Sequence, residues 1–320
     1  MQGTTVGRFA PSPSGRMHLG NVMSALLAWL GAKSVGGRMV LRIEDLDPER
    51  SRLEYARQIE EDLRFLGLDW DEGEGVGGAH GPYLQSRRTQ VYEEALERLS
   101  RQGLLYPCYC TRAELHAVTQ APHMGDGRFV YGGRCRSLGE AERAQLSASR
   151  KPAIRLRVPK EEIRFVDGLC GPCSQDLALA CGDFIVRRSD GAFAYQLAVV
   201  VDDVLMGVTQ VVRGRDLLDS TPRQLYLYRL LGAKPPAFYH VPLLLAPDGR
   251  RLSKRERDLD MGALRARYGA EEILGKLAWL TGLQDAPGPV SARELAGSFS
   301  WERVKRENLY LPEGLFEDRG

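Results

Sequence analysis

Residues 8–21 read RFAPSPSGRMHLGN, and after one helix-like run residues 36–45 read GGRMVLRIED. A short strand over residues 4–9 is expected to lead into a loop that holds prolines and a glycine. His18 and Gly20 then open a helix. This order places backbone N–H groups and the positive end of a helix dipole at the mouth of a strand–loop–helix unit. The stretch therefore predicts a phosphate-binding site.

A second cationic element lies roughly 230 positions further along the chain. Residues 250–257, RRLSKRER, hold five cations within eight residues. A solvated basic turn is the alternative interpretation of this stretch. Taken together, the two elements predict one nucleotide that is held from two sides.

The composition is that of a globular protein. The chain has 320 residues, 43% hydrophobic and 27% charged, which is enough for a large core divided into two or three domains. A net charge of +2 excludes a global basic field, so a nucleic acid would be held by a local surface. We find no secretory segment and no apolar run near the roughly 18 residues of a membrane span. We therefore expect a cytoplasmic monomer that does not contact membranes.

Apolar periodicity alternates between helix and strand patterns in the first hundred residues. Helices are predicted over 19–31, 53–66 and 91–99, a strand over 38–43 and a glycine-rich turn over 73–81. This alternation predicts a parallel α/β sheet. Residues 106–188 hold all six cysteines and show weak periodicity, so we interpret them as an insertion between two halves of the sheet.

The sheet pattern returns after residue 194. We interpret residues 195–201 as helical or buried. We predict a helix over 221–231, strands over 209–212 and 240–245, and mainly helical structure after residue 258. Ser220, Thr221 and Pro222 give a start signal for the helix over 221–231. The strand over 240–245 is expected to end in the turn Pro247-Asp248-Gly249.

Six motifs, in their order along the chain, resemble the catalytic core of glutamyl-tRNA synthetases. They are RFAPSPSGRMHLG, LRIEDLD, AYQLAVVVDD, VVRGRDLL, STPRQ and RLSKR, and the resemblance covers roughly residues 4–260. The resemblance implies the class I synthetase fold, an α/β Rossmann-type parallel sheet with an inserted zinc-bearing subdomain and a C-terminal helical subdomain. The implied domains are 1–106 and 191–260 for the halves of the catalytic domain, 107–190 for the insertion and 261–320 for the helical part.

The resemblance also implies the residues that bind ATP. Residues 18–21 resemble the HIGH element, with Asn21 in place of its last histidine, and residues 251–255 resemble the KMSKS element. His18 and Lys254 are the implied catalytic residues, and ATP with Mg²⁺ is implied to bind Ser14, His18, Gly20, Asn21, Ser253 and Lys254. Attack of a carboxylate on the α-phosphate needs placement and charge stabilisation, and little covalent chemistry from the protein. A purely structural role of His18 at a helix start is the alternative.

A pocket for a free acidic amino acid needs a carboxylate for the ammonium group and a guanidinium for the side chain. By resemblance, Glu44 holds the α-amino group of L-glutamate, and Arg213 is the best candidate for its side-chain carboxylate. The other implied glutamate-binding residues are Arg8, Phe9, Ala10, Pro11, Ser12 and Tyr195. Two alternatives stay open, with Glu44 as a solvated turn carboxylate and Arg213 as an ion-pair partner of Asp202, Asp203 or Asp216. Asp202 and Asp203 are themselves expected to position an arginine or to contact ribose indirectly.

Three cysteines within a short span predict a metal site. Cys108, Cys110 and Cys135 offer three thiolates to a structural Zn²⁺, which takes four ligands. Chemistry alone favours His116 or His123 as the fourth ligand, whereas the resemblance implies Tyr131. Free thiols on an insertion are the alternative interpretation. A second trio, Cys170, Cys173 and Cys181, is expected to be structural or incidental.

The length after the second cationic element bears on the substrate. Only 63 residues follow Arg257, which we expect to be too few for the anticodon-binding domain of a full glutamyl-tRNA synthetase. The chain is similar to the truncated paralogues, the glutamyl-Q tRNA(Asp) synthetases. These activate glutamate without tRNA and transfer it to queuosine in the anticodon of tRNA(Asp). The alternatives are a shortened synthetase that charges a tRNA 3′ end, a binding paralogue without catalysis, and a small-molecule adenylyltransferase.

Overall fold

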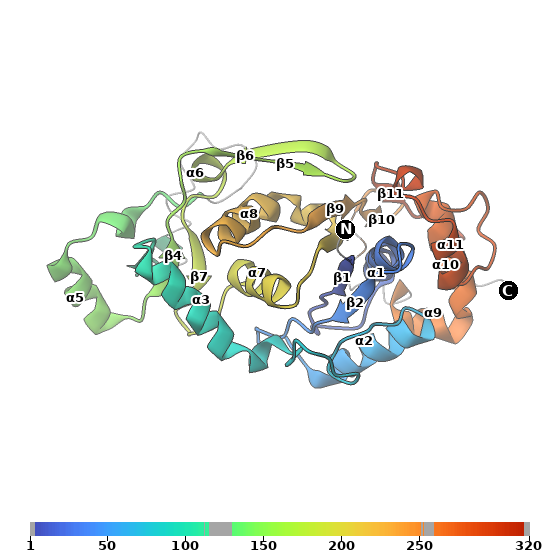
Figure 1. The fold of residues 1–320 in the computed structure, drawn as a ribbon, viewed down its shortest axis with the longest axis horizontal. Helices are drawn as coiled ribbons and strands as arrows, with labels where there is room; N and C mark the ends of the chain where they lie inside the picture. The colour runs from blue at the N-terminus through green and yellow to red at the C-terminus, as the bar shows by residue number, and fades with distance from the viewer. Residues whose placement is uncertain (1–3, 112, 115–129, 251, 253–258, 317–320) are drawn as a thin grey trace.

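A computed structural model describes residues 4–111, 113–114, 130–250, 252 and 259–316. The molecule is elongated (Figure 1), with helix α5 (Glu140–Ser149) at one end and helices α10 (Ala270–Thr281) and α11 (Ala292–Gly297) at the other. Parallel strands lie between these ends. Within the described ranges, no helix is long and apolar enough to cross a membrane.

Four parallel strands form the centre of the fold. Strand β1 (Val6–Phe9) pairs with β2 (Arg38–Leu41), and β8 (Gln210–Gly214) pairs with β9 (Ala237–Val241). The two pairs adjoin, because the backbone N–H of Thr209 donates to the Val6 carbonyl at 2.9 Å. The predicted parallel α/β arrangement is thereby confirmed.

Alternating side chains of these strands enter two separate cores. Val40 joins one apolar cluster, while its neighbours Met39 and Leu41 join the other. Both faces of the strands are therefore buried, as expected for a parallel sheet. Helices α1 (Leu19–Lys33) and α2 (Leu53–Phe65) contribute to the cluster that holds Met39 and Leu41. Helices α3 (Thr89–Arg101), α7 (Tyr195–Leu205) and α8 (Thr221–Leu230) contribute to the cluster that holds Val40.

The inserted region contains strands that the sequence did not predict. Strands β3 (Leu105–Cys108), β4 (Ala153–Leu156) and β7 (Phe184–Arg187) form an antiparallel sheet, and β5 (Glu162–Asp167) pairs with β6 (Gly171–Asp176) as a hairpin followed by α6 (Leu177–Ala180). The hairpin reaches back to the central parallel strands, since the Gly168 N–H donates to the Phe238 carbonyl in β9 at 2.8 Å. The inserted region therefore contacts the central strands directly.

The C-terminal segment shares its core with the first half of the sheet. Helix α9 (Met261–Arg267) precedes α10 and α11, and the buried residues of all three belong to the cluster that contains α1. Strand β11 (Leu309–Tyr310) then pairs in parallel with β10 (Leu244–Leu245). The helices expected after residue 258 are present, and the domain boundary at residue 260 stays a prediction.

Two local predictions differ from the structure. The strand expected over 240–245 is divided into β9 and β10 at Pro242, which cannot donate to a strand ladder. Ser220 precedes α8, but its side chain does not cap the helix; its hydroxyl accepts from Gln196 Nε2 at 3.0 Å. A 3₁₀ helix over Arg215–Ser220 runs directly into α8, which removes the need for a side-chain cap.

Candidate active site

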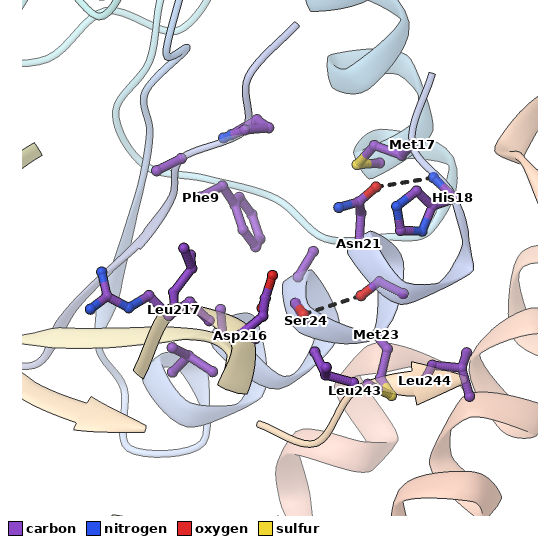
Figure 2. Close-up of a pocket in the computed structure, with 18 of the residues that line it drawn as sticks. Phe9, Met17, His18, Asn21, Met23, Ser24, Asp216, Leu217, Leu243 and Leu244 are labelled. Carbon is purple, nitrogen blue, oxygen red and sulfur yellow. Dashed lines mark hydrogen bonds between the residues drawn. The ribbon is translucent and has the colours of Figure 1, made fainter. Parts of the chain in front are cut away.

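A cavity of about 350 Å³ opens between the ends of β1 and β8 and the start of α1. It brings together eight residues that the sequence assigned to glutamate or ATP. These are Arg8, Phe9, Ala10, Pro11, His18, Gly20, Asn21 and Arg213. Figure 2 shows His18 and Asn21 on one side of this cavity and Asp216 and Leu217 on another. Residues from both halves of the sheet therefore face one space.

The side chain of Asn21 caps the start of α1. Asn21 Oδ1 accepts from the His18 backbone N–H at 3.2 Å (Figure 2), and the Asn21 N–H donates to the His18 carbonyl at 2.8 Å. Asn21 thus acts as the third-position partner of a helix cap. Gly20 lies below the His18 ring, since a Cβ built on Gly20 would be 3.3 Å from His18 Cε1.

The second cationic element meets the same cavity at one described residue. Leu252 is buried and lines the cavity together with His18. Ser253 and Lys254 lie outside the described residues, and so does Arg251. The cavity therefore includes the one residue of the RLSKR motif that the structure describes.

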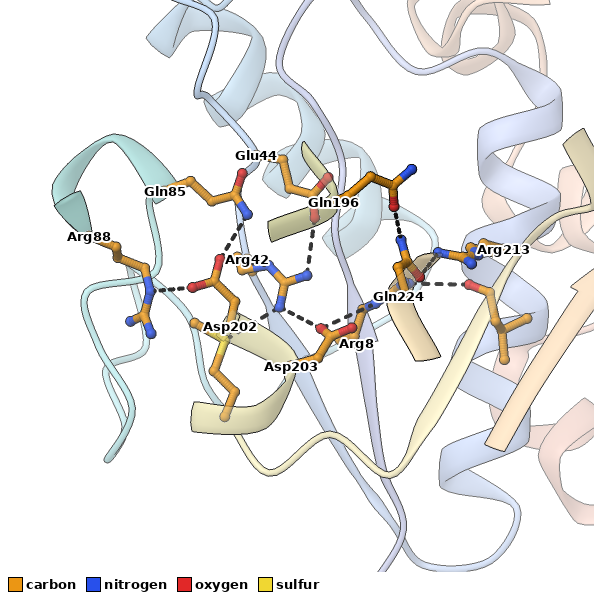
Figure 3. A network of polar contacts seen from close by, with 12 residues as sticks. Arg8, Arg42, Glu44, Gln85, Arg88, Gln196, Asp202, Asp203, Arg213 and Gln224 are labelled. Carbon is orange, nitrogen blue, oxygen red and sulfur yellow. Dashed lines mark hydrogen bonds and ion pairs between the residues drawn. The ribbon is translucent and has the colours of Figure 1, made fainter. Parts of the chain in front are cut away.

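A fully buried arginine joins the carboxylates near the cavity. Arg42 donates to Asp203 at 2.7 Å and to Glu44 at 3.0 Å, and its Nε lies 3.5 Å from Asp202. Figure 3 shows Arg42 between these three side chains. The prediction that Asp202 and Asp203 position an arginine is confirmed. Three buried arginines, Arg8, Arg42 and Arg88, pair with the three carboxylates, so the network is balanced in charge.

Glu44 is part of this buried network, so the alternative of a solvated turn carboxylate is wrong. Its side chain is 7% exposed. Burial raises the pKa of Glu44, and the neighbouring Arg42 and Arg8 oppose that rise without cancelling it. The turn carboxylate is Asp47 instead, whose Oδ1 accepts from the Glu49 N–H at 3.2 Å.

Arg213 differs from Arg42 and Arg88, which donate to carboxylates, because its own hydrogen-bond partners are neutral. Its Nε donates to His240 Nε2 at 3.0 Å, its Nη1 to Gln224 Oε1 at 2.8 Å and its Nη2 to Thr221 Oγ1 at 2.8 Å. Among the residues that the structure describes, no carboxylate forms an ion pair with Arg213. The expected alternative, pairing with Asp202, Asp203 or Asp216, is therefore wrong. Burial lowers the pKa of Arg213.

Four assigned residues lie next to the cavity and do not line it. Glu44 and Tyr195 still interact with cavity-lining arginines: Arg8 opposes the burial that raises the pKa of Glu44, and Tyr195 opposes the burial that lowers the pKa of Arg213. Ser12 is exposed and its carbonyl accepts the Ser14 N–H at 2.8 Å. Ser12 and Ser14 therefore lie in the loop between the cavity-lining residues Pro11 and Met17.

Sequence reasoning missed the residues that hold Arg213. Gln224 stood inside the quoted motif STPRQ, and its spacing of three from Thr221 puts both on one face of α8. His240 gave no signal of its own, because it occupies an ordinary position in an apolar strand. Arg42 likewise stood unassigned within LRIED.

Three of the predicted zinc ligands form one cluster. The sulfur atoms of Cys108, Cys110 and Cys135 all lie within 4.8 Å of one another. The Tyr131 hydroxyl lies 3.5 Å from Cys108 Sγ and 4.0 Å from Cys110 Sγ. Burial would raise the pKa of the Cys108 thiol, but hydrogen bonds from Tyr131 and Arg155 lower it overall. Burial and the neighbouring Cys135 raise the pKa of Cys110 to about 12.

The second cysteine trio is not a metal cluster in the structure. Cys170 Sγ contacts the His240 carbonyl at 3.7 Å, and Cys181 Sγ contacts the Leu177 carbonyl at 3.4 Å. Within the described part of the chain, the first trio is the only group of His, Cys, Asp or Glu with metal-ligand spacing. The other histidines considered as ligands, His116 and His123, lie outside the described residues.

Comparisons with known proteins agree with this geometry. The family described as tRNA synthetases class I (E and Q), catalytic domain, matches residues 4–288. A glutamyl-Q tRNA(Asp) synthetase of Symbiobacterium thermophilum is 54% identical over 96% of this chain and 95% of the relative. The chain belongs to the glutamyl-Q tRNA(Asp) synthetase family. It is accordingly a class I aminoacyl-tRNA synthetase-like ligase.

Two further comparisons extend the match. A member of the glutamyl-Q tRNA(Asp) synthetase family from Nitratidesulfovibrio vulgaris is 51% identical over 97% of both chains. A glutamate tRNA ligase of Elizabethkingia meningosepticum, solved in complex with its amino acid, superposes with a TM-score of 0.85 at 29% identity. That match covers 98% of this chain and 68% of the ligase, so the shared part is the class I catalytic fold.

Proposed function

We propose that the protein activates L-glutamate with ATP in the absence of tRNA and transfers the glutamyl group to queuosine in the anticodon of tRNA(Asp). The observation that carries the first step is Arg213, a buried cation at the cavity with neutral partners. A ligand carboxylate supplies the negative charge that this position lacks. The relatives named glutamyl-Q tRNA(Asp) synthetase support the second step.

We place glutamate in the cavity in one orientation. Its side-chain carboxylate is assigned to Arg213, and its ammonium group is directed toward Glu44, which lies beside the cavity and accepts from Arg42 at 3.0 Å. Its α-carboxylate then faces the start of α1, where His18 and Gly20 lie. Arg8, Phe9, Ala10 and Pro11 line the space between these ends, with Tyr195 beside Arg213 and Ser12 in the loop that follows Pro11.

Adenylation follows from placing the α-carboxylate in line with the α-phosphate of ATP. Negative charge spreads over the phosphate oxygens as the new bond forms and pyrophosphate leaves. We assign stabilisation of that charge to His18, the N-terminus of α1 and Lys254, with Ser14, Asn21 and Ser253 as further ATP contacts. ATP enters with Mg²⁺ as its counter-ion, and no general base is needed because the attacking carboxylate is already ionised.

The cysteine cluster fits a structural zinc ion. Its three thiols and the Tyr131 hydroxyl provide four donors at one point, which is the number that a closed zinc site needs. Zinc would tie β3 to the 3₁₀ helix over Arg134–Ser137 and so stabilise the inserted region. We assign 107–190 as this zinc-bearing subdomain, between catalytic halves at 1–106 and 191–260, with a helical subdomain at 261–320.

Two assays test glutamate activation and glutamate transfer separately. Glutamate-dependent exchange of pyrophosphate into ATP, measured without tRNA, tests activation. Transfer of labelled glutamate is then compared between tRNA(Asp) that carries queuosine, its unmodified transcript and tRNA(Glu). We expect label on the modified tRNA(Asp) alone. Charging of tRNA(Glu) would instead favour the shortened synthetase that acts on a tRNA 3′ end.

A further inference from the structure

We propose that His240 and Asp167 are positioning residues that hold Arg213 in the state that selects glutamate over glutamine. The inference rests on the proposed function and adds to it two residues that never touch the substrate. His240 belongs to β9, and Asp167 ends strand β5 of the inserted hairpin. The side chains of both are fully buried.

The position of the proton on His240 follows from its two partners. Arginine can only donate, so His240 Nε2 must accept from Arg213 Nε at 3.0 Å. The proton of the neutral ring is therefore on Nδ1, from which it is donated to Asp167 Oδ2 at 2.6 Å. Burial lowers the pKa of His240 and thus favours this neutral ring. Asp167 sets the tautomer, as a carboxylate does for a histidine in other buried pairs.

Asp167 is itself held in one orientation. Its Oδ1 accepts three backbone N–H groups, from Leu169 at 3.0 Å, Cys170 at 2.8 Å and His240 at 3.2 Å. Because Oδ1 is fully used, Oδ2 is left for the imidazole. The turn of the hairpin therefore fixes Asp167, Asp167 fixes the His240 ring, and the ring fixes the guanidinium of Arg213.

The other two acceptors of Arg213 are fixed in the same way. Gln224 turns its oxygen to Arg213 and donates its amide group to Gln196 Oε1 at 2.9 Å, and Gln196 donates in turn to Ser220 Oγ at 3.0 Å. Thr221 Oγ1 lies 3.2 Å from His240 Nε2 and can donate to it. Figure 3 shows the chain from Gln196 through Gln224 to Arg213. Three of the five N–H groups of Arg213 are thus bonded, which leaves two for Tyr195 and a ligand.

Neutral acceptors are what make the position selective. A carboxylate at any of the three places would already balance the guanidinium, and an added ligand charge would gain little. With neutral partners, glutamate supplies the missing charge, whereas the neutral side-chain amide of glutamine leaves a buried cation uncompensated. The Asp167 charge acts one residue away, through the imidazole, and therefore fixes Arg213 without neutralising it.

A matched pair of variants at position 240 tests this role. In His240→Gln the side-chain amide reaches the place of Nε2 and can accept from Arg213, whereas in His240→Asn it reaches only the place of Nδ1. We expect His240→Asn to raise the KM for L-glutamate about 10- to 100-fold in pyrophosphate exchange, as for loss of a hydrogen bond to a charged group. The KM for ATP should stay unchanged. The ratio of kcat/KM for glutamate to kcat/KM for glutamine should fall by the same factor as the KM for L-glutamate rises. His240→Gln should restore most of both values.

Asp167→Asn gives an independent test, because its amide can donate to Nδ1 and shift the imidazole proton to Nε2, facing Arg213. We expect the same loss of selectivity. His80→Asn is the control, since His80 Nδ1 also contacts a carboxylate, Glu72 at 2.7 Å, but does not line the cavity. The shift in thermal unfolding temperature caused by L-glutamate provides a readout that does not depend on turnover.

The outcomes separate this inference from the proposed function. Wild-type protein without glutamate-dependent exchange refutes the proposed function. If the wild type is active, equal selectivity of His240→Asn and His240→Gln overturns the positioning role, and so does a matching rise in the KM for ATP. A preserved selectivity ratio in Asp167→Asn overturns the role of the tautomer.

Discussion

The backbone N–H of Met261 donates to the carbonyl of Met17 at 2.9 Å, which joins the start of α9 to the residue before His18. Asp260 forms a bridge with His18 at the same place. Arg16 and Arg265 also share the buried carboxylate of Asp62, at 3.2 and 2.9 Å. The chain that follows the RLSKR motif is therefore attached beside the N-terminus of α1, and Leu252 within the motif lines the cavity.

Lys254 lies between these two attachment points in the sequence, which underlies the first prediction. We expect Lys254→Ala to lower glutamate-dependent pyrophosphate exchange at least ~100-fold, because a phosphate-neutralising charge contributes several kcal/mol in the transition state. The KM for glutamate should change little, since we assign that substrate to Arg213 and Glu44. Lys234→Ala removes the charge of an exposed lysine outside the cavity and serves as the control. Exchange at the wild-type rate in Lys254→Ala would exclude a catalytic role.

Gly20 allows a test of how closely His18 must be placed. A Cβ at position 20 would lie 3.3 Å from His18 Cε1 and 3.4 Å from Nδ1, so the ring must move by a few tenths of an ångström. We expect Gly20→Ala to lower kcat about tenfold, because small displacements of positioned groups are costly in rate. Thermal stability should be equal or higher, since alanine favours a helix more than glycine.

The control for this variant is Gly297→Ala in α11, where an added Cβ meets nothing within 4 Å. A Gly20→Ala protein with unchanged kcat would show that the His18 ring has freedom to shift during the reaction.

The sequence predicted the central strands and their helices because both faces of those strands are buried. Val40 and Met39 point into different cores, so neighbouring positions of the strand are both apolar, as in Met39–Leu41. The hairpin of β5 and β6 was missed for the opposite reason. One face of it is exposed, with Val166 at 75% exposure, and its strands carry charges and a proline that weaken the pattern.

In the candidate site, too, the sequence predicted some residues and missed others. Arg8, Glu44 and Arg213 were found from motifs, but what distinguishes them is their partners, and these come from distant parts of the chain. Asp203 lies 161 positions from Arg42, and His240 lies 27 positions from Arg213. Periodicity and local spacing carry no information on such pairs. Whether an arginine is balanced by a carboxylate can therefore be learned only from the folded chain.

The cysteine cluster leads to a prediction about metal content. We expect one zinc ion per chain in the wild type and almost none in Cys110→Ser, because a serine hydroxyl is a poor zinc ligand. Removal of zinc by a chelator should lower the unfolding temperature by at least about 5 °C, since the ion stabilises the inserted region. Metal analysis and thermal unfolding measure both effects.

Cys173→Ser is the matched control, because Cys173 belongs to the second trio, whose sulfur atoms do not form a metal cluster in the described part of the chain. Equal zinc content in Cys110→Ser and wild type would contradict the assignment. Zinc lost only in Cys173→Ser would move the site to the second trio.

Glu44 should make the binding of glutamate depend on pH. Burial raises its pKa above the ordinary 4.5, so the carboxylate becomes protonated at a higher pH than a solvated one. Protonation removes the charge that pairs with the substrate ammonium. We therefore expect affinity for L-glutamate to fall as the pH is lowered through the raised pKa, before the ligand's own carboxylates titrate. Calorimetric titration at several pH values measures this loss.

Glu44→Gln isolates the contribution of Glu44 to the pH dependence, because the amide does not titrate. The variant should bind glutamate weakly and lack the part of the pH dependence that Glu44 causes. Stability should change in the opposite sense. A raised folded-state pKa means that the folded protein binds the proton more tightly than the unfolded chain, so this stabilisation is present at acid pH and is lost as the pH rises through that pKa. The difference in unfolding temperature between ligand-free Glu44→Gln and the wild type should therefore shift in favour of the variant as the pH rises from acid to neutral. A constant difference would show that the ionised carboxylate costs the empty site nothing, and that Arg42 and Arg8 alone balance it.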